Sequence, residues 1–158
     1  MGAKVIVVAA ILAAGIVGVV GTRPAAGDPG QTLRFVVAPP LPGDLKQIDV
    51  PPAGLSLGDE SVGAVSLRHD GQLFGRAMSD CTINDATFEG QQCTLDLVLR
   101  TGVITTKTAG LDRLLPHQTA SPNDVFAVTG GTGSYAGANG VLTIHHGAQA
   151  DILTVQLM

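Results

Sequence analysis

Alternation of apolar and polar positions is the strongest structural signal in this chain. From residue 93 to 100, one face carries Cys93, Leu95, Leu97 and Leu99, and the other carries Thr94, Asp96, Val98 and Arg100. A period of two is typical of a half-buried strand. Comparable apolar runs predict strands at 33–38, 46–50, 60–68, 73–83, 103–108, 125–129, 139–146 and 152–157. No stretch of ten residues after the N-terminal segment has helical periodicity, so the pattern predicts an all-β protein.

Turn signals separate these runs at regular spacing. His69-Asp-Gly-Gln72 carries the Asp-Gly signal of a tight hairpin, and Thr101-Gly102 turns the chain between the next two runs. Gly75 indicates a bulge, and residues 109–123, with two prolines, predict a longer loop. Such spacing is typical of a sandwich or barrel, and about eight strands in this length fit a single small antiparallel eight-stranded β-barrel.

The N-terminal segment predicts export. Lys4 precedes an uninterrupted apolar run from Val5 to Val20, which is shorter than a full membrane span and suits a signal helix. Ala25-Ala-Gly27 offers a small-residue cleavage site. We therefore divide the chain into a signal peptide (1–27), an N-terminal extension (28–44) and a barrel domain (45–158), and expect a secreted or cell-envelope protein. An uncleaved N-terminal membrane anchor is the alternative.

Net charge and composition limit the classes of molecule that this chain is expected to bind. Without Lys4 and Arg23, seven basic residues stand against 13 acidic ones, so the mature chain has a net charge of −6. Nucleic acids and anionic membrane surfaces both favour a basic patch, so neither is expected as a partner. Tryptophan is absent, and four Phe with one Tyr are few for a stacking platform.

Cys81 and Cys93 are the only cysteines. They fall on consecutive predicted strands, nearly symmetric about the intervening turn, so they are expected as cross-strand neighbours. In an oxidising compartment a disulfide between them is plausible if the register is right. The alternative is two buried, unpaired thiols that act as small apolar side chains.

The segment from Phe126 to Ile144, with Ala127-Val-Thr-Gly-Gly-Thr-Gly-Ser-Tyr-Ala-Gly-Ala-Asn-Gly140 at its centre, joins two apolar runs through a glycine-dense turn. It lacks the Lys-Ser/Thr pair and the following helix of a phosphate-binding loop, so the glycines predict a β-corner. This segment resembles the late signature of the allene oxide cyclase/dirigent-like barrel family. Shorter stretches that agree in order are Asp49-Val-Pro-Pro52, Ser56-Leu-Gly-Asp59, Asp80-Cys-Thr-Ile83, Gln92-Cys-Thr-Leu95 and Thr101-Gly-Val-Ile-Thr105.

The resemblance implies a cofactor-free activity inside the barrel. Enzymes of the family fold or guide a small substrate with an apolar wall and a carboxylate at the end of the first strand. Asp49 is the candidate for that carboxylate, and the alternative is a solvated loop carboxylate. Tyr135, the only tyrosine, is the candidate for a hydroxyl at the barrel mouth, and the alternative is a ring that caps the barrel end. The expected function is that of an exported cyclase, isomerase or dirigent-like protein acting on a small apolar or phenolic substrate. The alternative is a non-catalytic barrel that binds a lipid-like molecule or serves the cell envelope.

The inward face of the clearest strand is the candidate ligand wall. Cys93, Leu95, Leu97 and Leu99 fit an apolar cup, although the same side chains would equally fill a solid barrel. Asp59 and Glu60 are interpreted as turn residues.

Metal binding is not expected, because the adjacent His145 and His146 must point to opposite faces of a strand. Members of the family often form trimers through the outer barrel wall, so the resemblance implies a homotrimer, with Val65 and Val98 as candidate contacts.

Overall fold

The computed structural model describes residues 30–85, 90–111 and 123–158, apart from the side chains of residues 109–111. The predicted signal peptide lies outside the described residues. The elements are β1 (Thr32–Val37), β2 (Leu45–Ile48), β3 (Glu60–His69), β4 (Gln72–Asp85), β5 (Gly90–Leu99), β6 (Gly102–Leu111), β7 (Asn123–Gly131), the 3-10 turn η1 (Gly133–Tyr135), β8 (Gly140–His145) and β9 (Ile152–Leu157). The all-β prediction is confirmed.

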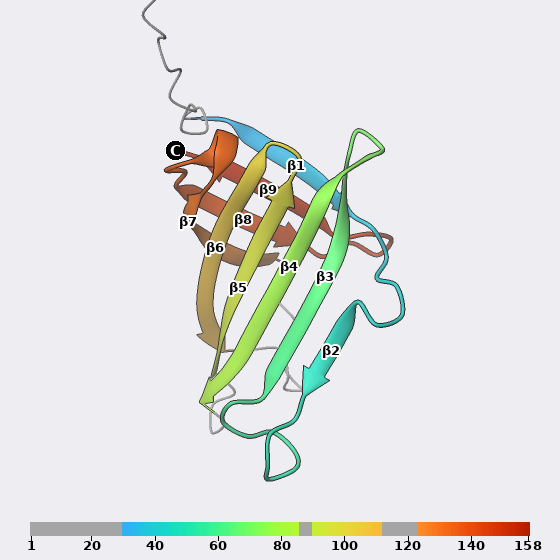
Figure 1. Cartoon of the computed structure of the whole chain (residues 1–158), viewed down its shortest axis with the longest axis vertical. Helices are drawn as coiled ribbons and strands as arrows, with labels where there is room; N and C mark the ends of the chain where they lie inside the picture. The colour runs from blue at the N-terminus through green and yellow to red at the C-terminus, as the bar shows by residue number, and fades with distance from the viewer. Residues whose placement is uncertain (1–29, 86–89, 112–122) are drawn as a thin grey trace, which may run out of the picture.

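The strands form one antiparallel sheet that closes into a barrel (Figure 1). Neighbours follow the order β1-β9-β8-β7-β6-β5-β4-β3-β2, and β1 also pairs with β3 through Val36 opposite Arg68 and Val37 opposite Leu67. β1 and β3–β9 therefore make the eight-stranded closed barrel that the sequence predicts. Closure leaves these strands without a long exposed edge.

The first barrel strand is broken into two pieces along the edge of β3. β1 pairs with the end of β3, and β2 pairs with its beginning through Leu45 opposite Gly63 and Ile48 opposite Glu60. In the described chain β2 has β3 as its only paired neighbour. The sequence predicts residues 28–44 as an extension ahead of the barrel domain, whereas β1, inside that range, is a barrel strand whose Phe35 is 1% exposed.

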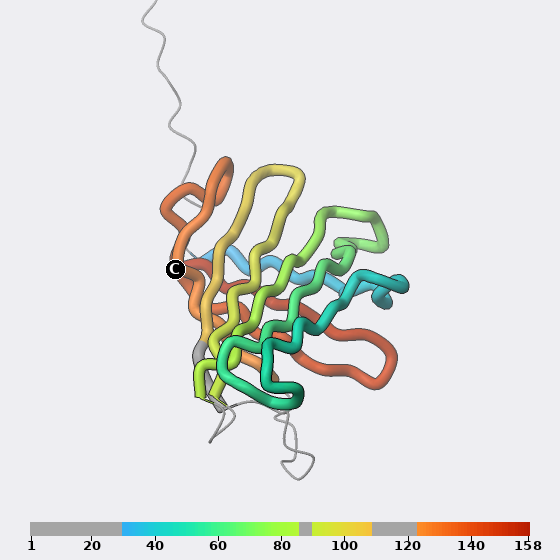
Figure 2. The backbone as a smooth tube through the Cα atoms, turned by 60° about the horizontal axis from the view of Figure 1, so that its bottom comes forward, coloured from blue at the N-terminus to red at the C-terminus, as the bar shows by residue number. Residues whose placement is uncertain are grey.

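The barrel has two distinct ends (Figures 1 and 2). At the hairpin end lie the β3–β4 turn, the β5–β6 turn and the glycine-dense corner between β7 and β8. At the other end, which we call the β2 end, β2 leads into β3, β4 into β5, and β8 into β9. The two ends differ in how their turns are built and in what fills the barrel beside them.

Local sequence explains the hairpin end. Asp70 and Gly71 have positive φ values of 49° and 75°, which the Asp-Gly signal supplies in a two-residue hairpin. A bulge follows at Phe74, because Leu67 pairs with Gly75 and Arg68 with Leu73. The predicted bulge at Gly75 is thus confirmed within one residue.

The glycine-dense segment is a β-corner, as predicted. A Cβ atom on Gly131 would lie 2.5 Å from the carbonyl oxygens of both Val103 and Tyr135. Only glycine allows the end of β7 to pass this close to β6 and to the following turn. The corner therefore packs backbone against backbone, and it seals the hairpin end of the barrel.

The core fills the barrel from the hairpin end to its middle. Its buried apolar side chains are Phe35, Leu67, Ala77, Cys93, Leu95, Leu97, Leu99, Ile104, Phe126, Val128, Tyr135, Ala138, Leu142, Leu153, Val155 and Leu157. Val65 packs against this cluster from β3. Its predicted place on the outer wall as a trimer contact is therefore wrong, because Val65 shares the inward face with Leu67; Val98, 40% exposed, does lie on the outer face.

The predicted boundary between the strand at 103–108 and the loop after it moved. Residues 109–111 continue β6, although the sequence pattern assigns them to a loop. They remain in a strand because Ala109, Gly110 and Leu111 pair with residues 90–92 of β5, and this pairing is a tertiary contact that local composition does not report. The remainder of that predicted loop, residues 112–122, lies outside the described residues.

Candidate functional site

A cavity of about 330 Å³ lies at the β2 end of the barrel. It is lined by β2 and the following loop together with the beginnings or ends of β3, β4 and β5: Gln47, Ile48, Asp49, Gly54, Leu55, Asp59, Glu60, Ser61, Cys81, Ile83 and Gln91. We call this the β2-end cavity. Its volume is at the small end of the range of about 300 to 1,000 Å³ that is usual for small-molecule sites.

The pairing register explains why the barrel is hollow here. Near the hairpin end, one inward row across the sheet is Val65, Ala77, Leu97 and Ile104, and it packs solidly. The next row towards the β2 end contains Gly63, Ser79 and Leu95. The third contains Gln47, Ser61, Cys81 and Cys93. On β3, the small residues Gly63 and Ser61 thus follow the larger Val65, and β4 offers only small side chains beside them, so space opens.

The disulfide between Cys81 and Cys93 is confirmed. The two residues are direct cross-strand partners on β4 and β5, with Cα atoms 4.0 Å apart. Cys93 is 5% exposed and belongs to the core, whereas Cys81 lines the cavity. The bond therefore ties the cavity wall to the packed part of the barrel.

The predicted apolar wall lies deeper than the cavity. Leu95, Leu97 and Leu99 are at most 7% exposed and are packed among other core side chains, and none of them lines the β2-end cavity. Of the four residues predicted to bind the ligand, Cys93 is nearest to the cavity, through its bond to Cys81. The apolar lining comes instead from Ile48, Leu55 and Ile83.

The loop between β2 and β3 is organised by Asp59. Its Oδ1 accepts hydrogen bonds from the backbone N–H of Val50 at 2.9 Å and from the Ser56 hydroxyl at 2.9 Å, and its Oδ2 accepts one from the Ser56 N–H at 2.7 Å. The bonds from Val50 and Ser56 stabilise the charged form and lower the pKa of the Asp59 carboxyl. Asp59 therefore remains a carboxylate at neutral pH, in the turn role predicted for it.

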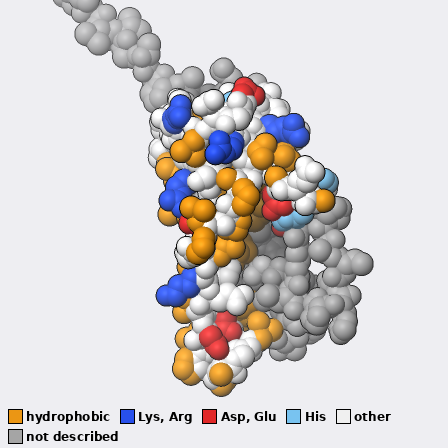
Figure 3. All heavy atoms as spheres, turned by 90° about the vertical axis from the view of Figure 1, so that its right-hand side faces the viewer, with side chains coloured by type: hydrophobic (Ala, Val, Ile, Leu, Met, Phe, Trp, Pro, Cys, Tyr) orange, Lys and Arg blue, Asp and Glu red, His pale blue; other side chains and the backbone are white. Residues whose placement is uncertain are grey.

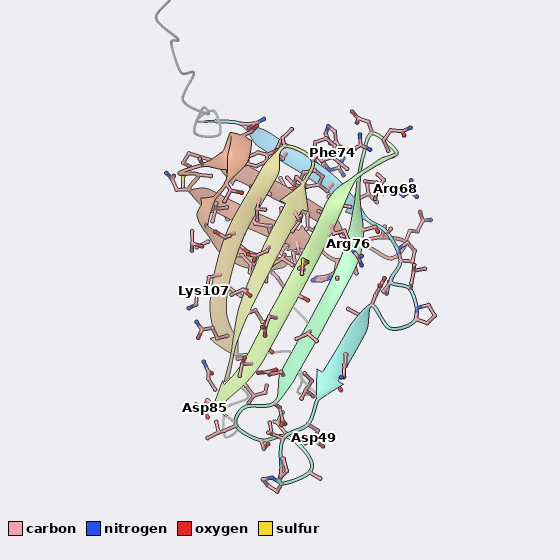
Figure 4. All side chains as sticks on the ribbon, in the orientation of Figure 1. Asp49, Arg68, Phe74, Arg76, Asp85 and Lys107 are labelled. Atoms are coloured by element: carbon pink, nitrogen blue, oxygen red, sulfur yellow. A yellow bond between two sulfur atoms is a disulfide. The ribbon has the colours of Figure 1, made fainter. Side chains whose placement is uncertain are left out.

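Asp49 lies on the rim of the cavity, just after β2 (Figure 4). It is exposed, and its Oδ2 accepts a long hydrogen bond of 3.4 Å from the Gly54 N–H. Asp59 accepts three hydrogen bonds from the loop, whereas Asp49 accepts one long one. The oxygens of Asp49 are therefore more available to a ligand than those of Asp59. Asp49 is positioned to face a molecule in the cavity.

Tyr135 lies at the other end of the barrel. It is 4% exposed, and its hydroxyl accepts a hydrogen bond of 3.1 Å from Thr101 Oγ1 in the β5–β6 turn. Gln91 of the cavity stands near the opposite end of β5. The structure therefore does not bring Asp49 and Tyr135 together, and the ring of Tyr135 caps the hairpin end.

A cluster that the sequence did not predict joins β7 to the turn between β8 and β9. His146 Nε2 lies 2.8 Å from Asp124 Oδ2, and His146 Nδ1 lies 3.1 Å from Asp151 Oδ2. His145 instead contacts the Asn123 side chain, at 2.8 Å. The two histidines thus point to different sides, as predicted, and His146 links β7 to the turn between β8 and β9.

Several cavity residues were missed from the sequence. Gln91 lies two positions before Cys93 on the inward face, so strict alternation was a usable signal for it. Ser61 shares a face with Val65 and Leu67 by the same alternation. Gln47 had no comparable signal, because its inward direction follows from how β2 docks on β3.

Exposed apolar side chains also occur on β2 and in the loops on either side of it, and we call this set the apolar lip. Six exposed ones fall within β2 and its flanking loops: Leu41, Leu45, Ile48, Val50, Leu55 and Leu57. Figure 3 views this side of the molecule and shows hydrophobic side chains over much of it. Ile48 and Leu55 belong to both the lip and the cavity lining, so the apolar surface continues from the outside into the barrel.

Comparison with protein-family models finds no match, and comparison with curated proteins finds none either. Solved structures do match. A pyocyanin demethylase aligns with a TM-score of 0.66 and 24% identity, over 81% of this chain and all of that one. A pterocarpan synthase dirigent protein aligns with a TM-score of 0.57 and 16% identity, over 80% of this chain and 84% of that one. AbnU, an exo-specific intermolecular Diels-Alderase, aligns with a TM-score of 0.57 and 17% identity, over 80% of this chain and 96% of that one.

These likenesses establish the fold. The chain has the allene oxide cyclase/dirigent-like barrel fold, as the sequence resemblance implied. The disulfide is consistent with an extracellular location. Within residues 30–85, 90–111 and 123–158, no helix has the length and apolar character needed to cross a membrane.

Proposed function

We propose that this barrel binds a small, largely apolar or phenolic molecule in the β2-end cavity and isomerises or cyclises it without a cofactor. The observation that carries the proposal is the cavity itself, because it occupies one end of a barrel that is otherwise filled by its core. The solved neighbours of the same fold include a demethylase, a dirigent protein and a Diels-Alderase, which supports small-molecule chemistry in such a barrel.

The lining suits catalysis by positioning. Ile48, Leu55 and Ile83 offer an apolar surface that would hold the substrate in a folded shape and exclude water from it. The amides of Gln47 and Gln91 both donate and accept hydrogen bonds, so they would orient a hydroxyl or carbonyl group of the substrate.

Asp49 would supply the charge. A carboxylate fixed at the rim stabilises positive charge that develops on a substrate during rearrangement or ring closure. Asp59 is less suited to this role, because its oxygens already accept three hydrogen bonds from the loop. The proposal therefore rests on Asp49, and it assigns no step to Tyr135.

A non-catalytic binder is the second candidate. It is favoured by the exposure of Asp49, since electrostatic catalysis is strongest where water is excluded. Such a protein would use the same apolar lip and the same cavity, and it would need no reactive group.

The first experiment is mass spectrometry of organic extracts from the purified mature protein, before and after incubation with mixtures of terpenoids and phenols. We expect one apolar small molecule per chain. Extracts that stay empty in both conditions would refute the proposed cavity ligand.

Asp49→Asn separates the two candidates. If the barrel is an enzyme, this variant loses turnover of the identified ligand and, for a neutral ligand, keeps its affinity, whereas Asp80→Asn, on the outer wall, retains both. Equal turnover in Asp49→Asn and the parent protein would remove Asp49 from the mechanism.

Export and self-association complete the proposal. We propose a secreted or envelope location on the N-terminal apolar segment and the disulfide. A homotrimer remains a proposal that Val98 alone now supports, as an exposed apolar residue on the outer face of β5.

A further inference from the structure

We infer that the β2-end cavity selects its ligand by charge, accepting neutral and cationic molecules and rejecting carboxylates. This inference rests on the proposed function, because it concerns the ligand of the same cavity. It narrows the substrate class from any small apolar molecule to phenols, neutral ring compounds and amines, and it disfavours fatty acids.

The charged groups around the cavity are of one sign. Asp49, Asp59 and Glu60 line it, and among the described residues no lysine, arginine or histidine does. Asp59 is held in its charged form by three hydrogen bonds from Val50 and Ser56. A ligand in the cavity would therefore meet a negative field that no lining cation offsets.

The nearest basic residues are directed elsewhere. Lys46 neighbours Gln47 on β2, but it lines a separate hollow on the outside of the barrel together with Arg76 and does not line the cavity. Arg76 lies 3.5 Å from Asp44 there. Arg68 donates to the Gly71 carbonyl at the hairpin end (Figure 4). None of these cations is placed to receive a ligand carboxylate in the cavity.

The neutral polar groups of the lining favour the same ligands. Ser61, Gln47 and Gln91 can accept hydrogen bonds from a phenol hydroxyl or an ammonium group. A carboxylate would lose its hydration on entering and would find only neutral donors beside three like charges. Size acts in the same direction, since about 330 Å³ suits a molecule of one or two rings better than a long acyl chain.

The test uses three naphthalene compounds of similar shape: 2-naphthylmethylamine as the cation, 2-naphthylmethanol as the neutral molecule and 2-naphthoate as the anion. The chain has no tryptophan and one tyrosine, so naphthalene fluorescence can be followed against a low background. We expect the cation to bind at least tenfold more tightly than the anion at low salt, which corresponds to about 1.4 kcal/mol. The neutral compound is expected between them, and the gap is expected to shrink in 0.5 M salt.

Matched double variants assign the effect to the cavity. Asp49→Asn with Glu60→Gln removes two charges from the cavity lining and should reduce the cation-to-anion ratio to about threefold or less. Asp80→Asn with Asp96→Asn removes two charges from the outer wall and should leave the ratio unchanged. An equal loss of the ratio in both pairs would mean that net charge acts at long range, and would overturn the inference.

The outcomes distinguish this inference from the proposed function. If the anion binds as tightly as the cation, charge selection is wrong and the cavity proposal stands. If no compound binds at millimolar concentration to protein that melts cooperatively, both are wrong. Binding in the order cation, neutral, anion supports both.

Discussion

Removing the Cys81–Cys93 bond tests how the cavity wall is held. The bond joins β4 and β5 across one row of the sheet, with the buried core on one side and the cavity on the other. The perturbation is the double variant Cys81→Ala with Cys93→Ala. Alanine avoids placing a new polar group at position 93, where the side chain is 5% exposed.

The magnitude follows from the loop that the bond closes. The two cysteines are separated by 12 positions, and a closed loop of this size restricts the unfolded chain by about 3 kcal/mol at 25 °C. With a urea dependence of about 2 kcal/mol per molar for a small domain, the unfolding midpoint should fall by about 1.5 M.

The assay is urea unfolding followed by far-UV circular dichroism, with and without a phosphine reductant. The reductant should lower the midpoint of the parent protein to near that of the double variant, and it should not move the variant. A midpoint shift below about 0.3 M would refute the reasoning, because it would mean that the β4–β5 turn is already ordered in the unfolded chain. A reductant effect on the variant would show that the reagent acts elsewhere.

Three further predictions concern the core, the loop and the strand cluster. Leu97→Ala should lower the free energy of unfolding by about 2 to 5 kcal/mol, because Leu97 is fully buried. Val98→Ala, on the outer face, should lower it by less than about 1 kcal/mol. Similar losses for the two variants in urea unfolding would contradict the assignment of Leu97 to the inward face. Asp59→Asn should destabilise the protein at pH 7, because the lowered pKa of Asp59 stabilises the fold at pH values above the ordinary pKa of 3.8. That contribution disappears as the pH falls through the lowered pKa of the folded state, so the melting temperatures of variant and parent should converge there. A difference in melting temperature that persists in acid would contradict this role of the Asp59 charge. In a double-mutant cycle, His146→Ala and Asp124→Asn should show a coupling of about 0.5 to 1 kcal/mol, since the pair is about a third exposed, and additive losses would show that the 2.8 Å contact stabilises nothing.

Local signals in the sequence were sufficient to predict the strands, one hairpin turn and the cross-strand disulfide. The alternation from residue 93 to 100 specified which side of β5 faces inward, and every predicted inward residue there is buried. Asp70-Gly71 specified a hairpin, because only a few residue types tolerate two positive φ values in succession. The cross-strand disulfide was predictable for a related reason, since the two cysteines flank a turn at nearly equal distances.

The site was predictable only in part. Asp49 does lie at the cavity, but Tyr135, grouped with it on resemblance, stands near the opposite end of the barrel. The sequence distance between two residues says little about which end of a meander they share, because successive turns alternate between the ends. His146 illustrates the same point, since its partners Asp124 and Asp151 come from β7 and from the turn before β9.

By itself, the sequence determined the strands, the inward face of β5 and the glycine corner, because each depends on residues that are close along the chain. The tertiary structure alone decided three features of the barrel. β1 closes it by pairing with β3, and β2 pairs with the same edge of β3 further along. The interior is filled at one end and hollow at the other. Whether the barrel is hollow depends on how inward side chains from β2, β3, β4 and β5 line up in one row. That alignment is set by pairing register between distant segments, which no local pattern contains.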